Sequence, residues 1–447
     1  MIPNSEFLWR EKMTKCKVLL GIFLLLLCIG VFACSRSETN QPRPAATEVA
    51  SASPTPQPCP ASASWITAPN PPTEIGGPNP PPVGNETNCQ FYQFAYQWFF
   101  AMTQPVGTSG ERKFETLNVY QPNKTNQCAV TALTGRANIA KALFVRTPKP
   151  TTNDFVPVVP EDIAQATGTP LYDQNGNVVL YYVLYSPNEC QATASGYLPN
   201  TMEIKASWRI LKSADPAYYT MTATVAGLPN NPVTLGLVGL HLVINTQLHP
   251  EFVWATFEHV NNAPNCTNPQ APPAAGWSFL SSSCATCLQQ NGVNGCPQCN
   301  FNVAPTTPPG ITGPATQVCR VYSDGTDPGS MTNGNNNDTN RFNIDTLNSQ
   351  IAGFLSQLPV TSPMSVWKNY TLVSGLWTNG GVSSGGADVQ RGSLEAANTT
   401  METFYQQPNH NCFSCHNYVQ QTPLTVSHIV SDLLPPSIAP KRVKETK

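Results

Sequence analysis

The chain of 447 residues contains few charged side chains. Only 11% of its residues are Asp, Glu, Lys or Arg, against roughly 25% in ordinary soluble domains. The 24 basic and 26 acidic residues give a net charge of −2, so the chain lacks the basic excess with which proteins bind nucleic acid. We therefore expect no nucleic-acid partner. A polar but weakly charged composition of this kind suits an exported protein.

Several catalytic signatures are missing as well. The sequence contains no Gly-x-Ser-x-Gly, Walker or dinucleotide-binding loop, which leaves common hydrolase, nucleotide and nicotinamide chemistry without support. Its apolar run at residues 18–33 is too short and too close to the terminus for an ordinary membrane span, and three lysines precede it. Residues 1–33 are therefore expected to be a signal peptide.

The end of this apolar run predicts a lipid anchor. Val31-Phe32-Ala33-Cys34-Ser35 resembles a bacterial lipobox, in which the cysteine is lipidated and becomes the mature N-terminus; an uncleaved anchor or plain secretion is the alternative. The resemblance implies lipidation at Cys34 and a periplasm-facing or outer-membrane lipoprotein. Residues 34–88 are rich in proline and are expected to form a semi-extended tether.

Cysteine usage points to the same compartment. Apart from Cys34, two cysteines of the signal peptide and two near the C-terminus, ten cysteines remain. An even number outside the cytoplasm favours up to five disulfides of unknown connectivity. Four of the ten form two C-x-x-C pairs that could bind zinc or iron, although export favours disulfides: Cys284, Cys287, Cys296 and Cys299.

Hydrophobic periodicity predicts an α+β fold. Apolar side chains recur at helical spacing over residues 91–102, and strand-like alternation or dense β-former runs cover five later segments, at 178–185, 202–210, 218–225, 234–246 and 252–260. We expect a helix plus a mostly antiparallel sheet over 89–260. A Cys-, Asn- and Gly-rich irregular insertion follows at 261–341, then a helical segment at 342–435 and a tail at 436–447.

One short motif carries chemistry. Cys412-Phe413-Ser414-Cys415-His416 reads C-x-x-C-H, the attachment signature of c-type haem. Two cysteines three residues apart present both sulfurs on one side of a helical turn, and the next residue offers an imidazole to the iron. Chance predicts roughly 0.007 such motifs in a chain of this composition. We therefore expect one covalent haem, bound through Cys412 and Cys415, with His416 as the proximal ligand.

The surrounding residues support a family resemblance. The segment NCFSCH, with NTTMETFYQ before it and SHI after it, resembles bacterial c-type cytochromes. The blocks MEIKASWRIL, GLVGLHLVINT and WATFEHVNNAP are similar to a largely uncharacterised group of large exported mono-haem cytochrome-like proteins. The resemblance covers residues 89–435. It implies a haem-binding segment at the C-terminal end of the chain, and of these features only C-x-x-C-H is mechanistically specific.

The sixth iron ligand is left open. No methionine follows His416, whereas small mono-haem cytochromes resembling this motif supply a distal methionine downstream. The candidates are Met401 and His428, followed by His241 and His259; core packing or a structural hydrogen bond is the competing interpretation of each. Methionine would raise the reduction potential, histidine would lower it, and an open position would admit a small ligand.

These features together predict an exported mono-haem c-type cytochrome for one-electron transfer at the bacterial cell envelope, with an unidentified redox partner protein. In the expected folded part, residues 89–411 precede the motif, a stretch far longer than a haem module needs. This excess motivates two alternatives. One is a haem enzyme, peroxidase- or oxidase-like, with an open sixth position, and the other is a non-catalytic haem sensor or binding lipoprotein.

Overall fold

The computed structural model describes most of the chain beyond residue 57: residues 58–108, 110–122, 124–130, 134–136, 169–225, 228, 231–306, 310–321, 337–378, 390–392, 397–406, 413, 416 and 423–440. The chain divides into two units, residues 1–55 and 56–447, and every described residue belongs to the second. The expected signal peptide, Cys34, Cys412 and Cys415 lie outside the described residues.

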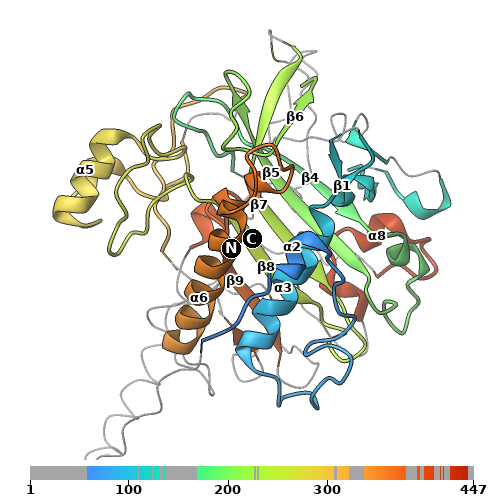
Figure 1. Cartoon of the computed structure of the whole chain (residues 1–447). Helices are drawn as coiled ribbons and strands as arrows, with labels where there is room; N and C mark the ends of the chain where they lie inside the picture. The colour runs from blue at the N-terminus through green and yellow to red at the C-terminus, as the bar shows by residue number, and fades with distance from the viewer. Residues whose placement is uncertain are drawn as a thin grey trace, which may run out of the picture. The chain divides into compact units, whose positions relative to one another are not determined.

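An eight-stranded antiparallel sheet organises this unit (Figure 1). Its strands run in the order β10-β9-β8-β7-β5-β4-β3, and β6 pairs with β7 beside β8. β1 and β2 form a separate two-stranded ribbon. The strands are β1 Pro105–Val106, β2 Glu111–Arg112, β3 Asn118–Val119, β4 Leu180–Tyr185, β5 Met202–Leu211, β6 Thr220–Ala223, β7 Val233–Ile244, β8 Val253–His259, β9 Tyr370–Thr378 and β10 Gln390–Gly392. The predicted antiparallel, sheet-rich α+β class is confirmed.

Helices are few and mostly short among the described residues. They are α2 Ser64–Thr67, α3 Asn88–Met102, α5 Ser282–Asn291, α6 Asn337–Ser356 and α8 Val430–Leu433. Short 3-10 turns connect them: η1 Lys113–Thr116, η2 Gln127–Ala129, η5 Pro187–Gln191, η6 Pro297–Cys299, η8 Ser365–Asn369, η9 Thr403–Tyr405 and η10 Pro423–Val426. The two long helices, α3 and α6, lie side by side across the sheet (Figure 1).

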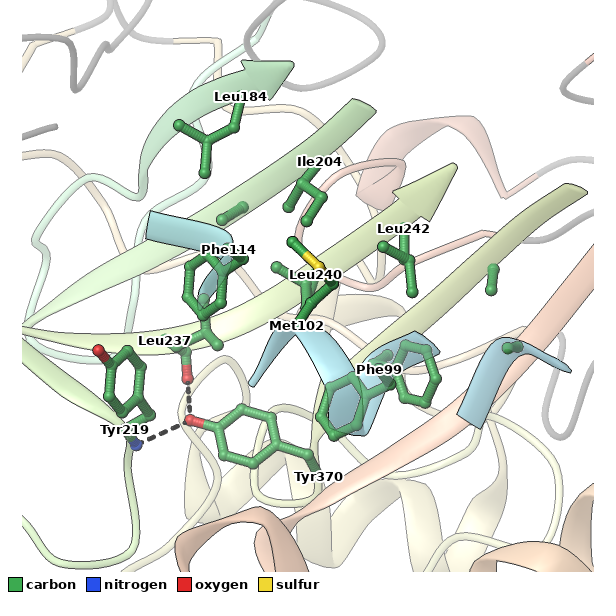
Figure 2. Packing of buried hydrophobic residues seen from close by; sticks show 14 of the residues in the cluster. Phe99, Met102, Phe114, Leu184, Ile204, Tyr219, Leu237, Leu240, Leu242 and Tyr370 are labelled. Atoms are coloured by element: carbon green, nitrogen blue, oxygen red, sulfur yellow. Dashed lines mark hydrogen bonds between the residues drawn. The ribbon is translucent and has the colours of Figure 1, made fainter. Parts of the chain in front are cut away.

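The main core lies between this helix pair and one face of the sheet. α3 begins with a capping box, in which Thr87 and Gln90 exchange hydrogen bonds, and this satisfies donors that a helix start otherwise leaves free. Its aromatic side chains pack on strand residues, for example Phe99 on Phe257 with ring centroids 4.2 Å apart. Figure 2 shows Phe99 and Met102 beside Ile204, Leu240 and Leu242. The aromatic stripe that the sequence shows in this helix is therefore core packing.

The described part of the expected tether packs on the folded unit. Cys59 forms a disulfide with Cys89 at the start of α3, and Ile66 and Ile75 are buried in the main core. The Trp98 indole donates a hydrogen bond to the Pro72 carbonyl at 2.9 Å. Residues 58–88 therefore belong to the domain, in contrast to the tether expected up to residue 88, because a few apolar side chains and one disulfide secure a proline-rich segment.

The C-terminal part differs from the helical segment expected at 342–435. After α6 the chain forms β9, an inner strand of the sheet, and β10 at its edge. Helical periodicity also predicts a helix around residues 394–405, but residues 399–405 form turns and one 3-10 turn. The Asn398 side chain accepts hydrogen bonds from the Thr400 amide and hydroxyl, 2.9 and 2.7 Å away. Such local side-chain bonds compete with helical ones.

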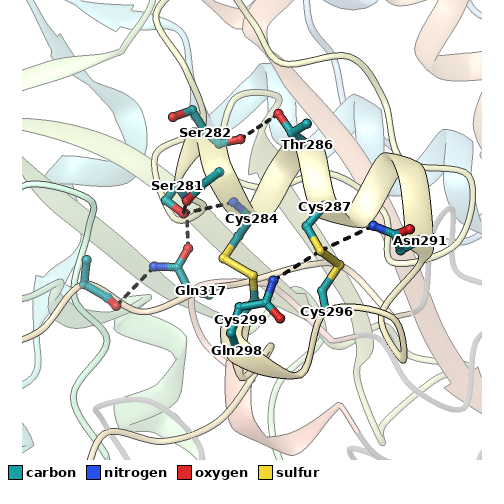
Figure 3. Close-up of a disulfide and its surroundings, with 12 residues drawn as sticks. Ser281, Ser282, Cys284, Thr286, Cys287, Asn291, Cys296, Gln298, Cys299 and Gln317 are labelled. Carbon is teal, nitrogen blue, oxygen red and sulfur yellow. Dashed lines mark hydrogen bonds between the residues drawn. A yellow bond between two sulfur atoms is a disulfide. The ribbon is translucent and has the colours of Figure 1, made fainter.

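All ten cysteines that the sequence leaves for disulfides are paired. The pairs are Cys59–Cys89, Cys128–Cys190, Cys266–Cys319, Cys284–Cys299 and Cys287–Cys296. The last two close the two C-x-x-C motifs on each other beside α5 (Figure 3), which confirms the disulfide interpretation over zinc. Five disulfides fit an oxidising compartment outside the cytoplasm. None of the described helices is long and apolar enough to cross a membrane.

Candidate functional site

The second face of the sheet is the platform for the C-x-x-C-H region. Strand alternation sends Ile204 and Leu242 to the main core and their neighbours Glu203 and Val243 to the opposite face. The strand register aligns Tyr185, Glu203, Val243, Trp254 and Leu376 in one row across β4, β5, β7, β8 and β9. The described C-terminal residues cover this row.

Two residues of the motif lie on the aromatic part of the row. Phe413 is fully buried against Trp254 and Leu376, which are partners across β8 and β9. The His416 ring lies 4.5 Å from the Trp254 ring, centroid to centroid. Cys412 and Cys415 lie outside the described residues, and of the motif only Phe413 and His416 are seen to pack on β8 and β9.

The imidazole of His416 is held by the segment that follows it. Its Nδ1 lies 3.0 Å from the Val426 carbonyl oxygen, a contact that Nδ1 can make only as a donor. The neutral ring therefore carries its proton on Nδ1 and leaves the lone pair of Nε2 for a metal. Burial lowers the pKa of His416 well below its usual range, and the neighbouring His428 lowers it further. A neutral imidazole is the form that binds a metal ion.

His428 is the candidate axial ligand that lies next to His416. The two rings stack with centroids 3.9 Å apart and planes 12° from parallel. Stacking face to face does not aim both lone pairs at one point, so binding of a single iron by both rings would require them to part. The short distance nevertheless joins two imidazoles that are twelve positions apart in the sequence.

Met401 is placed differently. Its side chain is fully buried in a separate apolar cluster with Val179, Tyr181 and Phe279. Thr400, its neighbour in the chain, accepts a hydrogen bond from the Tyr181 hydroxyl at 2.6 Å. These contacts are those of a core methionine.

The two strand histidines make hydrogen bonds of their own. The His241 Nε2 lies 2.9 Å from the Glu402 carboxylate, on the same sheet face as Lys205, its partner across the strands. His259 stacks on Tyr218 at 3.9 Å, and its Nε2 donates to the Ala217 carbonyl. Burial lowers the pKa of His259 to about 4, and both of its ring nitrogens are in use.

Sequence reasoning missed the acidic pair next to this site. Glu189 of η5 is fully buried, and Glu203 of β5 lies close enough to raise its pKa. No sequence motif identifies two carboxyl groups that are fourteen positions apart, because their approach depends on the turn between β4 and β5. A stretch with the alternation Met-Glu-Ile-Lys-Ala predicts only that Glu203 and Lys205 share a face.

An open pocket of about 290 Å³ lies away from the motif residues. Its lining includes Arg112, Arg136 and Tyr219. Both guanidinium groups are engaged: Arg112 donates to the Thr103 and Pro363 carbonyls, and Arg136 pairs with the buried Glu115 at 3.1 Å. Both arginines therefore link segments of the chain that are distant in sequence.

Comparison with known proteins does not assign the chain to a family. No protein-family model, no curated protein and no solved structure matches the chain. Within the described residues, no group of three or more His, Cys, Asp or Glu side chains could hold a metal ion, and the two cysteines of the motif are not among those residues. The candidate site therefore depends on the C-x-x-C-H motif and on the geometry around His416.

Proposed function

We propose that the protein is an exported mono-haem c-type cytochrome that transfers single electrons at the bacterial cell envelope, anchored by lipid at Cys34. In this proposal Cys412 and Cys415 bind the porphyrin through thioether bonds and His416 binds the iron. A haem held there would supply one-electron iron chemistry. The chain's own task is to orient the imidazole, exclude water and present the site to a redox partner protein.

The contact from His416 Nδ1 to the Val426 carbonyl carries the proposal. It fixes the ring's orientation and directs its free Nε2 lone pair away from the protein hydrogen bond. An ordinary surface histidine needs no such support. Trp254 contacts the His416 ring and Phe413 packs on Trp254, and an apolar surround suits a porphyrin.

We further propose His428 as the sixth ligand. It is the candidate whose ring contacts His416, whereas Met401 is packed in another cluster. Ligation by two histidines favours an electron carrier with a lowered reduction potential. An enzyme of the peroxidase or oxidase class would need an open sixth position, which His428 would fill once its ring parts from that of His416.

Electronic spectra of three purified proteins test this assignment. The wild type, produced in a host competent for cytochrome maturation, is expected to be low-spin and six-coordinate in both oxidation states. His428→Ala is expected to become high-spin and to return to low-spin when imidazole is added. Met401→Ala is the control, with its spin state unchanged and its stability reduced by about 2–5 kcal/mol through lost packing.

A different result would favour the second candidate function. A high-spin wild type that binds cyanide and turns over peroxide would contradict the carrier and support the haem enzyme. A low-spin His428→Ala protein would retain the carrier but reject His428 as the ligand.

A further inference from the structure

Buried oxygen atoms without hydrogen bonds gather beside the candidate site. Both carboxylate oxygens of Glu189, one of Glu203 and the hydroxyl of Tyr185 are buried and lack a hydrogen-bond partner. Tyr185 and Glu203 are partners across β4 and β5, and the charge of Glu189 acts on the Tyr185 hydroxyl. Burying such groups unpaired is costly. A cluster of this kind requires an explanation.

The simplest explanation for these unpaired oxygen atoms is a proton bound by the two carboxyl groups. Burial raises the pKa of Glu189 well above its usual range, and Glu203 raises it further. Burial also raises the pKa of Glu203, to about 7, although the Ser427 hydroxyl and Glu189 partly oppose this. Two carboxyl groups in such contact cannot both ionise readily, so near neutral pH the pair holds at least one proton.

The pair lies within electrostatic reach of the histidines. Glu203, Val243 and Trp254 follow one another across β5, β7 and β8, which places Glu203 about 10 Å from Trp254 at the usual strand spacing. The segment that supports His416 crosses this row: Val426 packs on Val243, and Ser427 acts on Glu203. The pair thus lies beside the segment that supports His416.

Other titratable groups also face the pair. Tyr185 of β4 and Tyr197 of the following loop adjoin it, and Tyr197 donates a hydrogen bond to the Leu424 carbonyl. On α8, the Asp432 carboxylate accepts a hydrogen bond from Tyr120. Farther along the same sheet face lies Glu402, which His241 contacts at 2.9 Å and near which Lys205 also lies.

We propose that the Glu189–Glu203 pair is a redox-linked proton site. If a haem held by His416 gained one electron from the redox partner protein, the pair would take up one proton from bulk solvent and form an O–H bond on a carboxylate oxygen. Oxidation would release the electron and the proton. The inference depends on the proposed cytochrome function and adds to it that electron transfer here moves a proton.

Coulomb's law gives the size of the coupling. Since the His416 ring lies 4.5 Å beyond Trp254, the separation is roughly 10 to 15 Å, at which one charge in an effective dielectric constant of about 20 shifts a pKa by roughly one unit. The reduction potential is therefore expected to fall by about 59 mV in total as pH rises through neutrality, the one-electron equivalent of a tenfold change in proton binding. At lower and higher pH, where both redox states hold the same number of protons, the potential is expected to be flat.

Potentiometric titration of the haem-loaded protein from pH 5 to pH 9 tests the proposal. Glu203→Gln keeps the side-chain shape and is expected to remove the fall in potential. Glu402→Gln is the matched control, since it removes a carboxyl on the same sheet face and is expected to keep the fall. Reduced-minus-oxidised infrared spectra should show a protonated-carboxyl band in the wild type and in the control, and lose it in Glu203→Gln.

The outcomes separate the two proposals. A haem-containing wild type whose potential does not change with pH overturns the proton site and leaves the cytochrome standing. A fall that persists in Glu203→Gln also overturns it, because another group must then titrate. A colourless protein overturns both.

Discussion

At the scale of single residues, the clearest contrast is between two buried histidines. His249 lies between two carboxylates, with Nδ1 3.0 Å from Glu251 and Nε2 3.3 Å from Glu86. Burial alone would lower its pKa, but the two carboxylates outweigh this and raise the pKa above its usual range. Among the described residues no carboxylate forms an ion pair with His259, and burial lowers its pKa to about 4 although Asp215 acts weakly in the opposite direction. The same side chain is therefore used once as a cation and once as a neutral ring.

This contrast predicts opposite pH dependence of stability. The stabilising effect of charged His249 is complete below the unfolded-state pKa and is lost as pH rises through the higher folded-state pKa. His249→Gln should lower the free energy of unfolding by about 3 kcal/mol at pH 6, as expected when a buried ion pair is broken, and by less at pH 9. Urea titrations at both values measure the difference.

His259→Gln is the control for this prediction. Its folded-state pKa of about 4 means that neutral His259 contributes stability above the unfolded-state pKa and loses it as pH falls. The cost of His259→Gln should therefore grow from pH 5 to pH 8. Equal slopes for the two variants would refute the assignment of charge.

At the scale of elements, the turn at residues 397–406 packs closely on the second face of the sheet, the face opposite the main core. A Cβ on Gly239 of β7 would lie 2.5 Å from the Thr400 hydroxyl and 2.6 Å from the Ser207 hydroxyl. These two hydroxyls hydrogen-bond each other at 2.6 Å. Only glycine at position 239 lets the turn approach the strand this closely, and this turn precedes the C-x-x-C-H motif.

Gly239→Ala is accordingly expected to destabilise the protein by about 1–3 kcal/mol through overpacking. Gly353→Ala is the comparison, since Gly353 lies on the exposed side of α6 with open space around its Cα. There alanine should stabilise by about 0.5–1 kcal/mol, because glycine is a poor helix former. Chemical denaturation measures both, and destabilisation by both alanines would argue against the close approach.

At the scale of the whole molecule, disulfides join parts of the chain that are distant in sequence. Cys128–Cys190 spans 62 residues and links η2 to η5, whereas Cys287–Cys296 spans nine beside α5. η5 carries Glu189, so the longer link also secures the acidic pair. Cross-linking a longer loop removes more entropy from the unfolded chain.

Loop entropy predicts unequal losses when these bridges are removed. Replacing both cysteines by serine should cost about 4 kcal/mol for Cys128–Cys190 and about 2.6 kcal/mol for Cys287–Cys296. Denaturant midpoints of the two double variants, compared with wild type, measure the order. A larger loss from the short bridge would mean that local packing around α5 outweighs the entropy of the chain.

The sequence predicted those parts of the fold that depend on local pattern. Alternation along β5 and the apolar run of β7 identified central strands, since a strand's side-chain period is two whatever its partners. Residues 394–405 were expected to be helical because their apolar spacing fits a helix, while the bonds made by the Asn398 side chain favour turns. Local spacing does not report such competition.

Long-range contacts could not be predicted in this way. The approach of His416 to His428 and of Glu189 to Glu203 depends on strand register and on the path of connecting turns. The sequence named His428 as one of several candidate ligands, yet its chemistry alone gave no reason to place it beside His416 rather than elsewhere. It gave no sign of Trp254 beneath that histidine, because an aromatic on a strand is ordinary core material.

The covalent bond between the chain and haem is the claim on which the functional account depends. Intact mass spectrometry of the mature protein, made in a host competent for cytochrome maturation, measures it directly, with a Cys412→Ala/Cys415→Ala double variant alongside. The account predicts a wild-type mass increased by one haem and a double variant without that increase. A wild-type protein without haem, whose Cys412 and Cys415 are joined to each other, would contradict it.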